Sequence, residues 1–298
     1  MRFAFIINSQ SPQSAADARK LQSMFGDEHS YLITQVAGEA TVLSQQAVDY
    51  GYTHIIAVGG DGTINEVVNG MMASAKYAET KPFFTILPRG SGNDFARSLG
   101  ISKQLNHLRE RLNSTDVCSI DIGLVEFKDL NGNDCSRYFI NVMDAGLGGH
   151  VAQKVSQYKR GLWSFTAYQR AILTTLPFYN KKTATLNSEN YRHSGPVLSV
   201  VVANGRWFGN GLCISPDASL RDGALQLVVL GDVGILEYLL YLPRVLREKK
   251  IKHKAVVYKS IKSVIIDGIN IPLQLDGEFV GYTPLKVTAV ASALNVLQ

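Results

Sequence analysis

Two glycine-rich turns, each following an apolar strand pattern and preceding a helix pattern, constrain this chain most. The first reads GGDGT at 59–63 after the β-branched run 54–58, and the second reads GSGND at 90–94 after the run 83–87. Strand, turn and helix in this order predict a parallel sheet with helices on both faces. Such folds bind ligands at the carboxyl ends of neighbouring strands, so the two turns mark a candidate site.

The rest of the chain divides into an α/β part and a β part. Before residue 118, strand patterns at 3–8 and 31–36 alternate with helix patterns at 14–25, 41–50 and 104–112. After it strand patterns dominate, with helix patterns at 163–176 and 235–249. The strand patterns lie at 120–127, 138–143, 197–203, 225–230, 255–266, 273–275 and 285–296. At roughly 150 residues per domain, 298 residues favour two domains. The sequence therefore predicts a doubly wound parallel α/β domain over 1–123 and an antiparallel β domain over 124–298.

Charge and composition exclude several classes of protein. The three cysteines form no CxxC pair, which argues against a disulfide framework or a zinc site and favours a reducing compartment. The chain contains no run of 18 apolar residues, so we expect no membrane-spanning helix. The formal charge of +5 divides into −2 for residues 1–123 and +7 for residues 124–298, which indicates an anionic partner. We expect no nucleic acid, because no zinc finger, RNP or helix-turn-helix signature is visible.

Three glycines in the first turn let the backbone approach an oligophosphate, and the following helix N-terminus favours an anion. Asp61 would repel phosphate, so it requires a role: it could hold Mg²⁺, bind a ribose hydroxyl or act as a base. The alternative is an ordinary glycine turn with an N-capping Asp61, and for the second turn a tight turn capped by Asn93 or Asp94.

A pair of carboxylates near the end of the chain is a candidate for proton transfer. Asp276 and Glu278 lie about 6–7 Å apart if the segment is strand-like. Either could accept the proton of an attacking hydroxyl. The alternative is an Asp-Gly hairpin turn.

Together these motifs resemble the diacylglycerol kinase catalytic domain family, in its soluble bacterial lipid kinase branch, which is related to sphingosine kinases and, more distantly, to NAD kinases. The motifs are GGDGTINE at 59–66, PRGSGNDFAR at 88–97, FIN at 139–141, GLG at 146–148, NG at 204–205, GNG at 209–211, PDA at 216–218, DG at 222–223 and LDGE at 275–278. The resemblance implies an ATP-binding α/β domain, a β-sandwich domain and a substrate cleft between them.

The resemblance also implies site residues. Asp61 would lie nearest the phosphates and the catalytic Mg²⁺. The proton acceptor would be Asp276 or Glu278, and we favour Glu278 with Asp276 in the metal or water network. A structural Mg²⁺ would be held by Ser219, Asp222 and Ala224. The expected nucleotide contacts are Asn8, Ser11, Thr41, Gly59, Gly60, Asp61, Gly62, Thr63, Ile64, Asn65, Glu66, Gly90, Ser91, Asn93 and Asp94.

The function expected from this resemblance is an ATP- and Mg²⁺-dependent lipid kinase that phosphorylates diacylglycerol or a related lipid. An NAD kinase-like enzyme and a non-catalytic lipid- or nucleotide-binding protein are the alternatives. A kinase without a spanning helix must meet its lipid at a membrane surface, so we expect a cytoplasmic protein with reversible peripheral membrane contact. The sequence leaves open whether the protein forms a homodimer.

Two segments are candidates for that contact. Segment 154–165 mixes basic with aromatic residues, and 244–262 holds eight Lys or Arg. For 244–262 the alternative is a solvated helix face. The basic residues of this second segment are Arg244, Arg247, Lys249, Lys250, Lys252, Lys254, Lys259 and Lys262.

Overall fold

The structure is a computed structural model that describes residues 1–298 except 12, 157–170 and 173. It divides into two compact units: unit 1 is Met1–Ile120 with Ser292–Gln298, and unit 2 is Asp121–Ala291. The chain passes between them in β5 (Val117–Lys128) and β17 (Glu278–Leu297). The sequence analysis expected a single boundary after residue 123; the compact units change after Ile120, and Ser292–Gln298 returns to unit 1 within the strand pattern 285–296.

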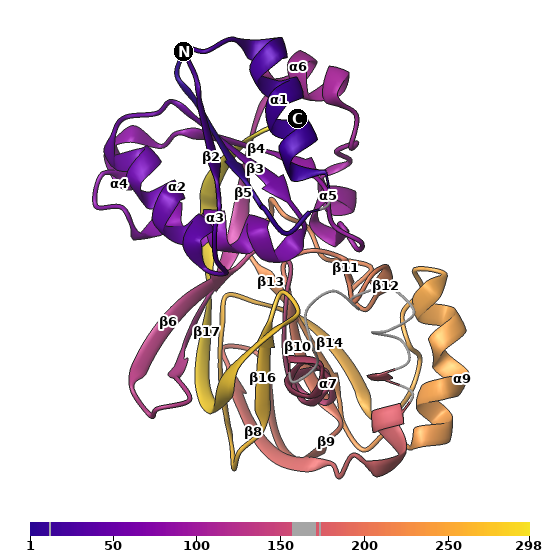
Figure 1. The fold of residues 1–298 in the computed structure, drawn as a ribbon. Coiled ribbons are helices and arrows are strands. Elements are labelled where there is room, and N and C mark those ends of the chain that lie inside the picture. Colours follow the sequence, from indigo (N-terminus) through magenta and orange to yellow (C-terminus); the bar gives the residue numbers. More distant parts are fainter. Residues whose placement is uncertain (12, 157–170, 173) are drawn as a thin grey trace. The chain divides into compact units, whose positions relative to one another are not determined.

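Unit 1 is built on a parallel sheet (Figure 1). Its strand order is β2-β1-β3-β4-β17, and every pair is parallel. β1, β3 and β4 are buried almost throughout, as their uniformly apolar sequences predict for a sheet covered on both faces. The bounds of these strands are β1 Phe3–Ile7, β2 Ser30–Ile33, β3 His54–Gly59 and β4 Phe83–Pro88.

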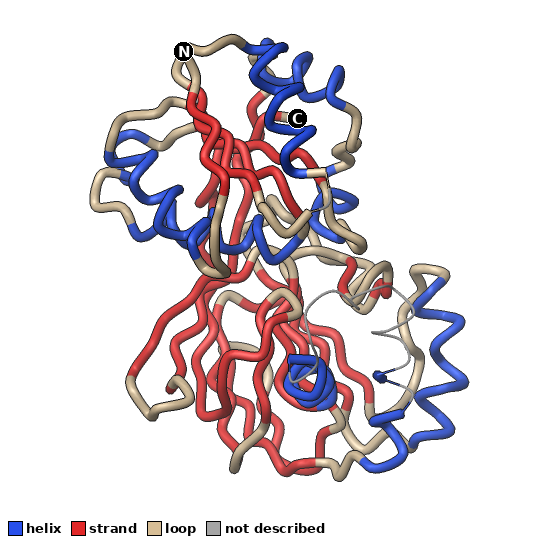
Figure 2. The backbone as a smooth tube through the Cα atoms, in the orientation of Figure 1, coloured by secondary structure: helices blue, strands red, loops and turns tan. Residues whose placement is uncertain are grey.

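Helices cover both faces of this sheet (Figure 2). α1 (Ser14–Phe25) and α6 (Leu105–Asn113) place Leu21, Leu108 and Leu112 in a core with phenylalanines and aliphatic residues of β1 and β3. α2 (Glu39–Asp49) and α3 (Asp61–Ala73) pack against each other and cover the opposite face. Two short helices complete the unit, α4 Tyr77–Thr80 and α5 Asp94–Leu99.

Unit 2 is rich in β-strands, and its main strand order is β14-β13-β10-β7-β16-β17. β15 and β5 each pair with β17, β8 with β15, β9 with β8, and β6 with β5. A separate pair is formed by β11 (Trp207–Phe208) and β12 (Leu212–Cys213). The remaining bounds are β6 Asp134–Phe139, β7 Val142–Gly146, β8 Lys182–Ser188, β9 Arg192–Val197, β10 Ser199–Ala203, β13 Leu225–Leu230, β14 Val256–Ile261, β15 Ser263–Gly268 and β16 Pro272–Leu275.

Two apolar cores stabilise unit 2. One lies among the strands, and the other lies beneath the helices α7 (Leu147–Ser156) and α9 (Ile235–Leu246) and the short helix η1 (Leu176–Phe178). The predicted class, an α/β domain followed by a β-rich domain, is confirmed. The helix predicted at 163–176 falls mostly outside the described residues. Within the described residues, no helix combines the length and apolarity needed to cross a bilayer.

Candidate functional site

The two glycine turns lie side by side at the carboxyl ends of neighbouring strands. Gly59 at the end of β3 is in register with Pro88 at the end of β4, and the Arg89 amide donates to the Gly59 carbonyl at 2.7 Å. The sequence predicted this adjacency from strand order alone. The structure therefore brings the two turns together at one edge of the sheet.

Glycine is required where the turns touch. A Cβ on Gly90 would lie 2.6 Å from the Cα of Gly60, and a Cβ on Gly60 would lie 3.0 Å from the Cα of Gly90. A Cβ on Gly62, by contrast, would meet no atom within 4 Å. Gly60 and Gly90 thus allow backbone to pack on backbone, while Gly62 leaves open space in front of the first turn of α3.

Asp61 joins the two turns. Its carboxylate oxygens accept hydrogen bonds from the backbone amides of Asp94 (3.2 Å) and Phe95 (3.1 Å) at the start of α5. Desolvation raises the pKa of Asp61, and the amide donors partly offset that rise. Carboxylate oxygens are also ligands that Mg²⁺ accepts, directly or through water. Asp61 can therefore hold the loops and face a cation at once.

Two asparagines shape the same loops. The Asn93 side chain accepts from the Gly90 amide (3.0 Å) and donates to the Gly90 carbonyl (2.7 Å), with φ at 52°. Asn8 donates from Nδ2 to the Thr63 hydroxyl at 2.9 Å. These contacts assign Asn8 and Asn93 a structural role in the turns, next to any role toward a ligand.

The predicted nucleotide contacts fall into two groups. Thr63, Ile64, Asn65 and Asp94 are buried, and Asp94 pairs with Arg97 at 3.2 Å, so only their backbone could meet a nucleotide. Ser91 and Gly62 are exposed. α3 begins at the N-cap Gly60, which has no side chain to cap the helix. Exposed amides, the Ser91 hydroxyl and a helix N-terminus suit an anionic ligand.

The remaining predicted contacts surround the turns less closely. Glu66 accepts from the Gly38 amide at 3.2 Å, just before the helix that carries the half-buried Thr41. Ser11 accepts from the Gln13 amide at 3.4 Å.

Arg89 is a residue of this region that the sequence analysis missed. Its guanidinium pairs with Asp17 of α1 through Nε (2.6 Å) and Nη2 (3.1 Å) and also donates to the Lys103 carbonyl. An arginine beside a glycine turn could have been taken for a phosphate ligand. Here it ties the second turn to α1, and the 72-residue separation from Asp17 hides that role in the sequence.

Asp276 and Gly277 form a two-residue turn between β16 and β17. Their φ angles are 47° and 92°, and Leu275 pairs with Glu278 across the turn. The strand-like segment expected for the two carboxylates is therefore wrong, because Asp276 and Gly277 form a hairpin turn; a role of the carboxylates in proton transfer stays a prediction. The Asp-Gly preference for two positive φ angles is the physical reason.

The Asp276 carboxylate is held by three backbone amides. It accepts from Ile140 (2.8 Å), Asn141 (2.9 Å) and Val142 (2.9 Å). These amides belong to the break between β6 and β7, where the sequence predicted one continuous strand over 138–143. Asp276 thus positions the turn against the neighbouring backbone.

Glu278 lies on the other side of the same turn and is open to solvent. Its side chain is 53% exposed, and Oε2 accepts from Nη2 of Arg137 at 2.5 Å. Of the two predicted carboxylates, Glu278 is therefore the one that can reach a substrate hydroxyl. Arg137 was not singled out from the sequence.

Asp144, also missed, is a buried carboxyl in unit 2. It lies on β7 and accepts from the Ser199 hydroxyl at 2.7 Å. Burial raises its pKa to about 7, against the effect of Ser199 and one backbone amide.

The predicted metal loop keeps its oxygen groups near the surface. Ser219 and Asp222 are exposed; the Asp222 carboxylate accepts from the Ala224 amide at 3.2 Å. The neighbouring Gly223 amide donates to the buried Asp121 at 2.7 Å. One carboxylate, a hydroxyl and a carbonyl are ligands that Mg²⁺ accepts. In the described part of the chain, however, no three His, Cys, Asp or Glu side chains gather around one point.

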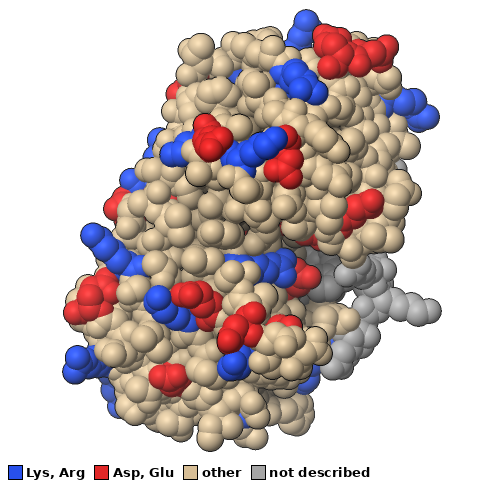
Figure 3. All heavy atoms as spheres, turned by 90° about the vertical axis from the view of Figure 1, so that its left-hand side faces the viewer, with Lys and Arg blue, Asp and Glu red and all other residues tan. Residues whose placement is uncertain are grey.

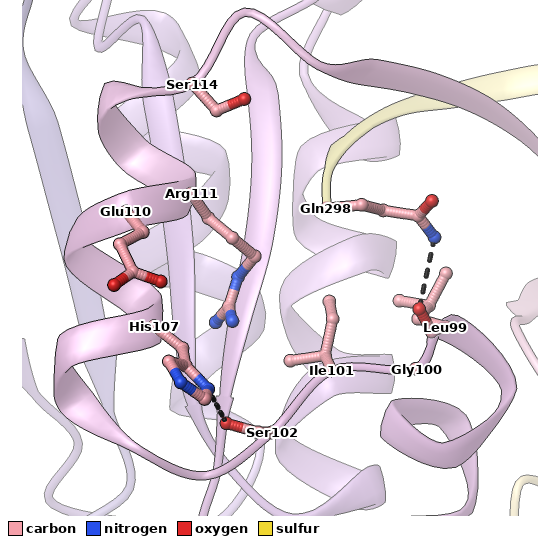
Figure 4. A pocket seen from close by; sticks show the side chains of 9 residues that line it. All are labelled: Leu99, Gly100, Ile101, Ser102, His107, Glu110, Arg111, Ser114 and Gln298. Carbon is pink, nitrogen blue, oxygen red and sulfur yellow. Dashed lines mark hydrogen bonds between the residues drawn. The ribbon is translucent and has the colours of Figure 1, made fainter.

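A cavity of about 410 Å³ lies elsewhere in unit 1 (Figure 4). At its wall, Arg111 donates to the Ile86 carbonyl at 2.9 Å, and His107 meets the Ser102 hydroxyl at 2.7 Å. None of the predicted site residues lines it. Its lining residues are Leu99, Gly100, Ile101, Ser102, His107, Glu110, Arg111, Ser114 and Gln298.

Comparisons with known proteins show which families and relatives this chain is similar to. Residues 2–125 match the family described as Diacylglycerol kinase catalytic domain, and residues 141–298 match the YegS C-terminal NAD kinase beta sandwich-like domain. A protein of Staphylococcus carnosus named "Diacylglycerol kinase" is 29% identical over 92% of this chain and 83% of its own length. A protein of Pseudomonas syringae pv. syringae named "Probable lipid kinase YegS-like" is 30% identical over 75% and 68%.

The fold is also found among solved structures. A crystal structure described as a diacylglycerol kinase of Bacillus anthracis str. Sterne superimposes with a TM-score of 0.72 at 19% identity, covering 99% of this chain and 96% of that one.

Proposed function

This chain belongs to the diacylglycerol kinase family, and from that premise we propose that it transfers the γ-phosphate of ATP to the hydroxyl of a lipid. The observation that supports this most is the pair of adjacent glycine turns in front of the uncapped start of α3. Exposed amides and the Ser91 hydroxyl there suit the phosphates of a nucleotide. Phosphoryl transfer needs mainly positioning and charge stabilisation, which such a cradle supplies.

In this proposal Asp61 faces a Mg²⁺ ion while holding the second turn. Its carboxylate accepts the Asp94 and Phe95 amides, and the same carboxylate would take the cation or its water. When bound, Mg²⁺ neutralises charge on the phosphates. A second Mg²⁺ would be structural, held by the Ser219 hydroxyl, the Asp222 carboxylate and the Ala224 carbonyl.

The proton of the attacking hydroxyl would go to Glu278. Its carboxylate is exposed, whereas that of Asp276 already accepts three amides. Arg137 lies at 2.5 Å and orients the Glu278 carboxylate. The roles proposed are therefore Glu278 as the general base and Asp276 as the residue that holds its turn in place.

The test is transfer of labelled phosphate from ATP, with and without Mg²⁺, to a panel of acceptors in mixed micelles. The panel holds diacylglycerol, monoacylglycerol, phosphatidylglycerol, a sphingoid base, a polyprenol and, in solution, NAD. Labelled product from one lipid in the presence of Mg²⁺ supports the proposal. Labelled NADP alone would support the alternative of an NAD kinase. No turnover of any acceptor would leave a binding protein and contradict both kinases.

A lipid acceptor implies contact with a membrane. We propose that this contact is peripheral and reversible and that the basic segment 244–262 takes part in it. Segment 154–165, the other candidate, falls mostly outside the described residues.

A further inference from the structure

Helix α9 is apolar on two opposite faces, and the described part of the chain covers only one of them. Its inner face packs Tyr238, Tyr241, Leu242 and Val245 onto the core beneath the helices of unit 2. Its outer face leaves Leu236 72%, Leu240 69% and Leu246 51% exposed, with Leu239 at 37%. In Figure 1, α9 lies at the edge of unit 2. A helix that only covers a core would carry polar residues on this outer side.

The exposed leucines form one stripe. Leu236, Leu239 and Leu240 repeat with helical spacing, and the exposed Pro243 and Leu246 continue the same side one and two turns later. Singly exposed leucines are common on soluble proteins, but a contiguous stripe along a three-turn helix marks an interaction surface. The stripe is long enough to lie along a surface and too short to span one.

Basic side chains follow the stripe directly. Residues 235–254 hold six Lys or Arg and two Glu, a formal charge of +4. Both glutamates are engaged, Glu237 with His253 and Glu248 with Arg206. Within the described residues, no ion pair forms at the exposed Arg247, Lys249, Lys252 or Lys254. The face in Figure 3, by contrast, intersperses positive and negative side chains.

We propose that the leucine stripe of α9, with the basic residues 247–254, docks this protein onto an anionic bilayer. This inference rests on the proposed lipid acceptor and names the surface that meets the membrane. The leucines enter the boundary between headgroups and acyl chains, and the basic side chains meet lipid phosphates. A second copy of the chain fits this surface poorly, because it would bring two segments of charge +4 together.

The test measures binding to sedimented vesicles of mixed phosphatidylcholine and phosphatidylglycerol, without ATP or acceptor. The double variant L236Q/L240Q should bind at least about tenfold more weakly, since burying one leucine already contributes more than a factor of ten. The double variant K249Q/K252Q should bind about 25-fold more weakly at low salt, from about fivefold per basic residue. Added salt should weaken wild-type binding.

Matched controls separate docking from general surface effects. Leu130→Gln removes a leucine that is 63% exposed elsewhere in unit 2, and K20Q/K103Q removes two exposed lysines of unit 1. Both should bind like the wild type. Equal binding by L236Q/L240Q and the wild type would overturn the proposal, as would equal wild-type binding to vesicles of phosphatidylcholine alone. Sedimentation velocity that showed a dimer abolished by L236Q/L240Q would assign the stripe to self-association and also overturn it.

Failure of docking and failure of the kinase are distinguishable. Activity toward a short-chain, dispersed diacylglycerol needs no bilayer, so L236Q/L240Q should keep the wild-type rate there. Wild-type protein that binds vesicles through α9 but phosphorylates no lipid would contradict the proposed function and leave the docking surface intact.

Discussion

Asp61 in the first glycine turn and Asp276 in the Asp-Gly turn both accept hydrogen bonds from backbone amides, two in unit 1 and three in unit 2. What each turn leaves exposed differs. Around Asp61 the exposed groups are amides and the Ser91 hydroxyl, which donate hydrogen bonds and suit an anion. Beside Asp276 the exposed group is the Glu278 carboxylate, which accepts a proton.

The turn of Asp61 therefore suits ligand binding, and the turn of Asp276 suits proton transfer. In each turn an aspartate holds the loop, and its neighbours are left to meet a ligand. An acid in a glycine turn is therefore not by itself the reacting group; its hydrogen-bond partners decide whether it can react.

The largest expected effect concerns Asp144, and it tests whether hydrogen-bond donors control the charge of a buried carboxyl. Asp144 is 3% exposed and has the Ser199 hydroxyl and one backbone amide as donors. Because its folded pKa is raised to about 7, its contribution to stability is present below about pH 4 and is lost as pH rises toward 7. The free energy of unfolding of Asp144→Asn, minus that of the wild type, should rise by about 4 kcal/mol from pH 4 to pH 8.

Urea unfolding of both proteins across that pH range measures this gain. If the difference in free energy of unfolding between variant and wild type stays constant from pH 4 to pH 8, Asp144 is ionised throughout this range. That result would contradict the claim that a buried carboxyl with few hydrogen-bond donors stays protonated.

The next effect concerns Asp276. In Asp276→Asn an amide nitrogen must face backbone N–H groups, so at least one donor loses its partner. We expect the free energy of unfolding to fall by about 2–3 kcal/mol. The matched control is Asp267→Asn, an exposed aspartate in another Asp-Gly pair of unit 2, which should change stability little. If the two variants were equally stable, the Asp276 carboxylate would not be what holds its turn in place.

The smallest effect tests the anion cradle. Gly62→Ala adds a methyl group that meets no protein atom within 4 Å, in a helix where alanine is favoured over glycine. Stability without ligand should therefore be kept or rise. ATP affinity should fall about tenfold, since a lost phosphate–amide contact costs about 1.4 kcal/mol. Calorimetric titration with ATP and Mg²⁺ measures it, and unchanged affinity would place the nucleotide away from α3.

Much of this arrangement could be predicted from local sequence. The helix pattern at 14–25 coincides with α1, because apolar spacing and Gly26 mark its face and its end. The adjacency of the glycine turns followed from the order of parallel strands. The strand–turn–helix pattern led to both glycine turns, and the resemblance implied the roles of Asp276 and Glu278.

What could not be predicted depends on partners distant in sequence. The strand pattern at 138–143 is interrupted because its amides bind Asp276, more than 130 residues away. The pattern at 255–266 divides into β14 and β15 at Lys262, whose amide donates to Glu189. Arg89 finds Asp17 in the same way. Periodicity reports the local backbone and carries no information on such contacts.

The division between Asp276 and Glu278 is tested most directly by the rate of phosphoryl transfer in a single turnover, with enzyme in excess over labelled ATP and a short-chain acceptor. Glu278→Gln should lower this rate ~10²–10⁴-fold with its melting temperature unchanged. Asp276→Asn, measured per folded molecule, should stay within about tenfold of the wild type. Glu126→Gln, which alters an equally exposed glutamate paired with Lys286, should have no effect. A wild-type rate in Glu278→Gln, or a larger loss in folded Asp276→Asn, would contradict the assignment of Glu278 as the base.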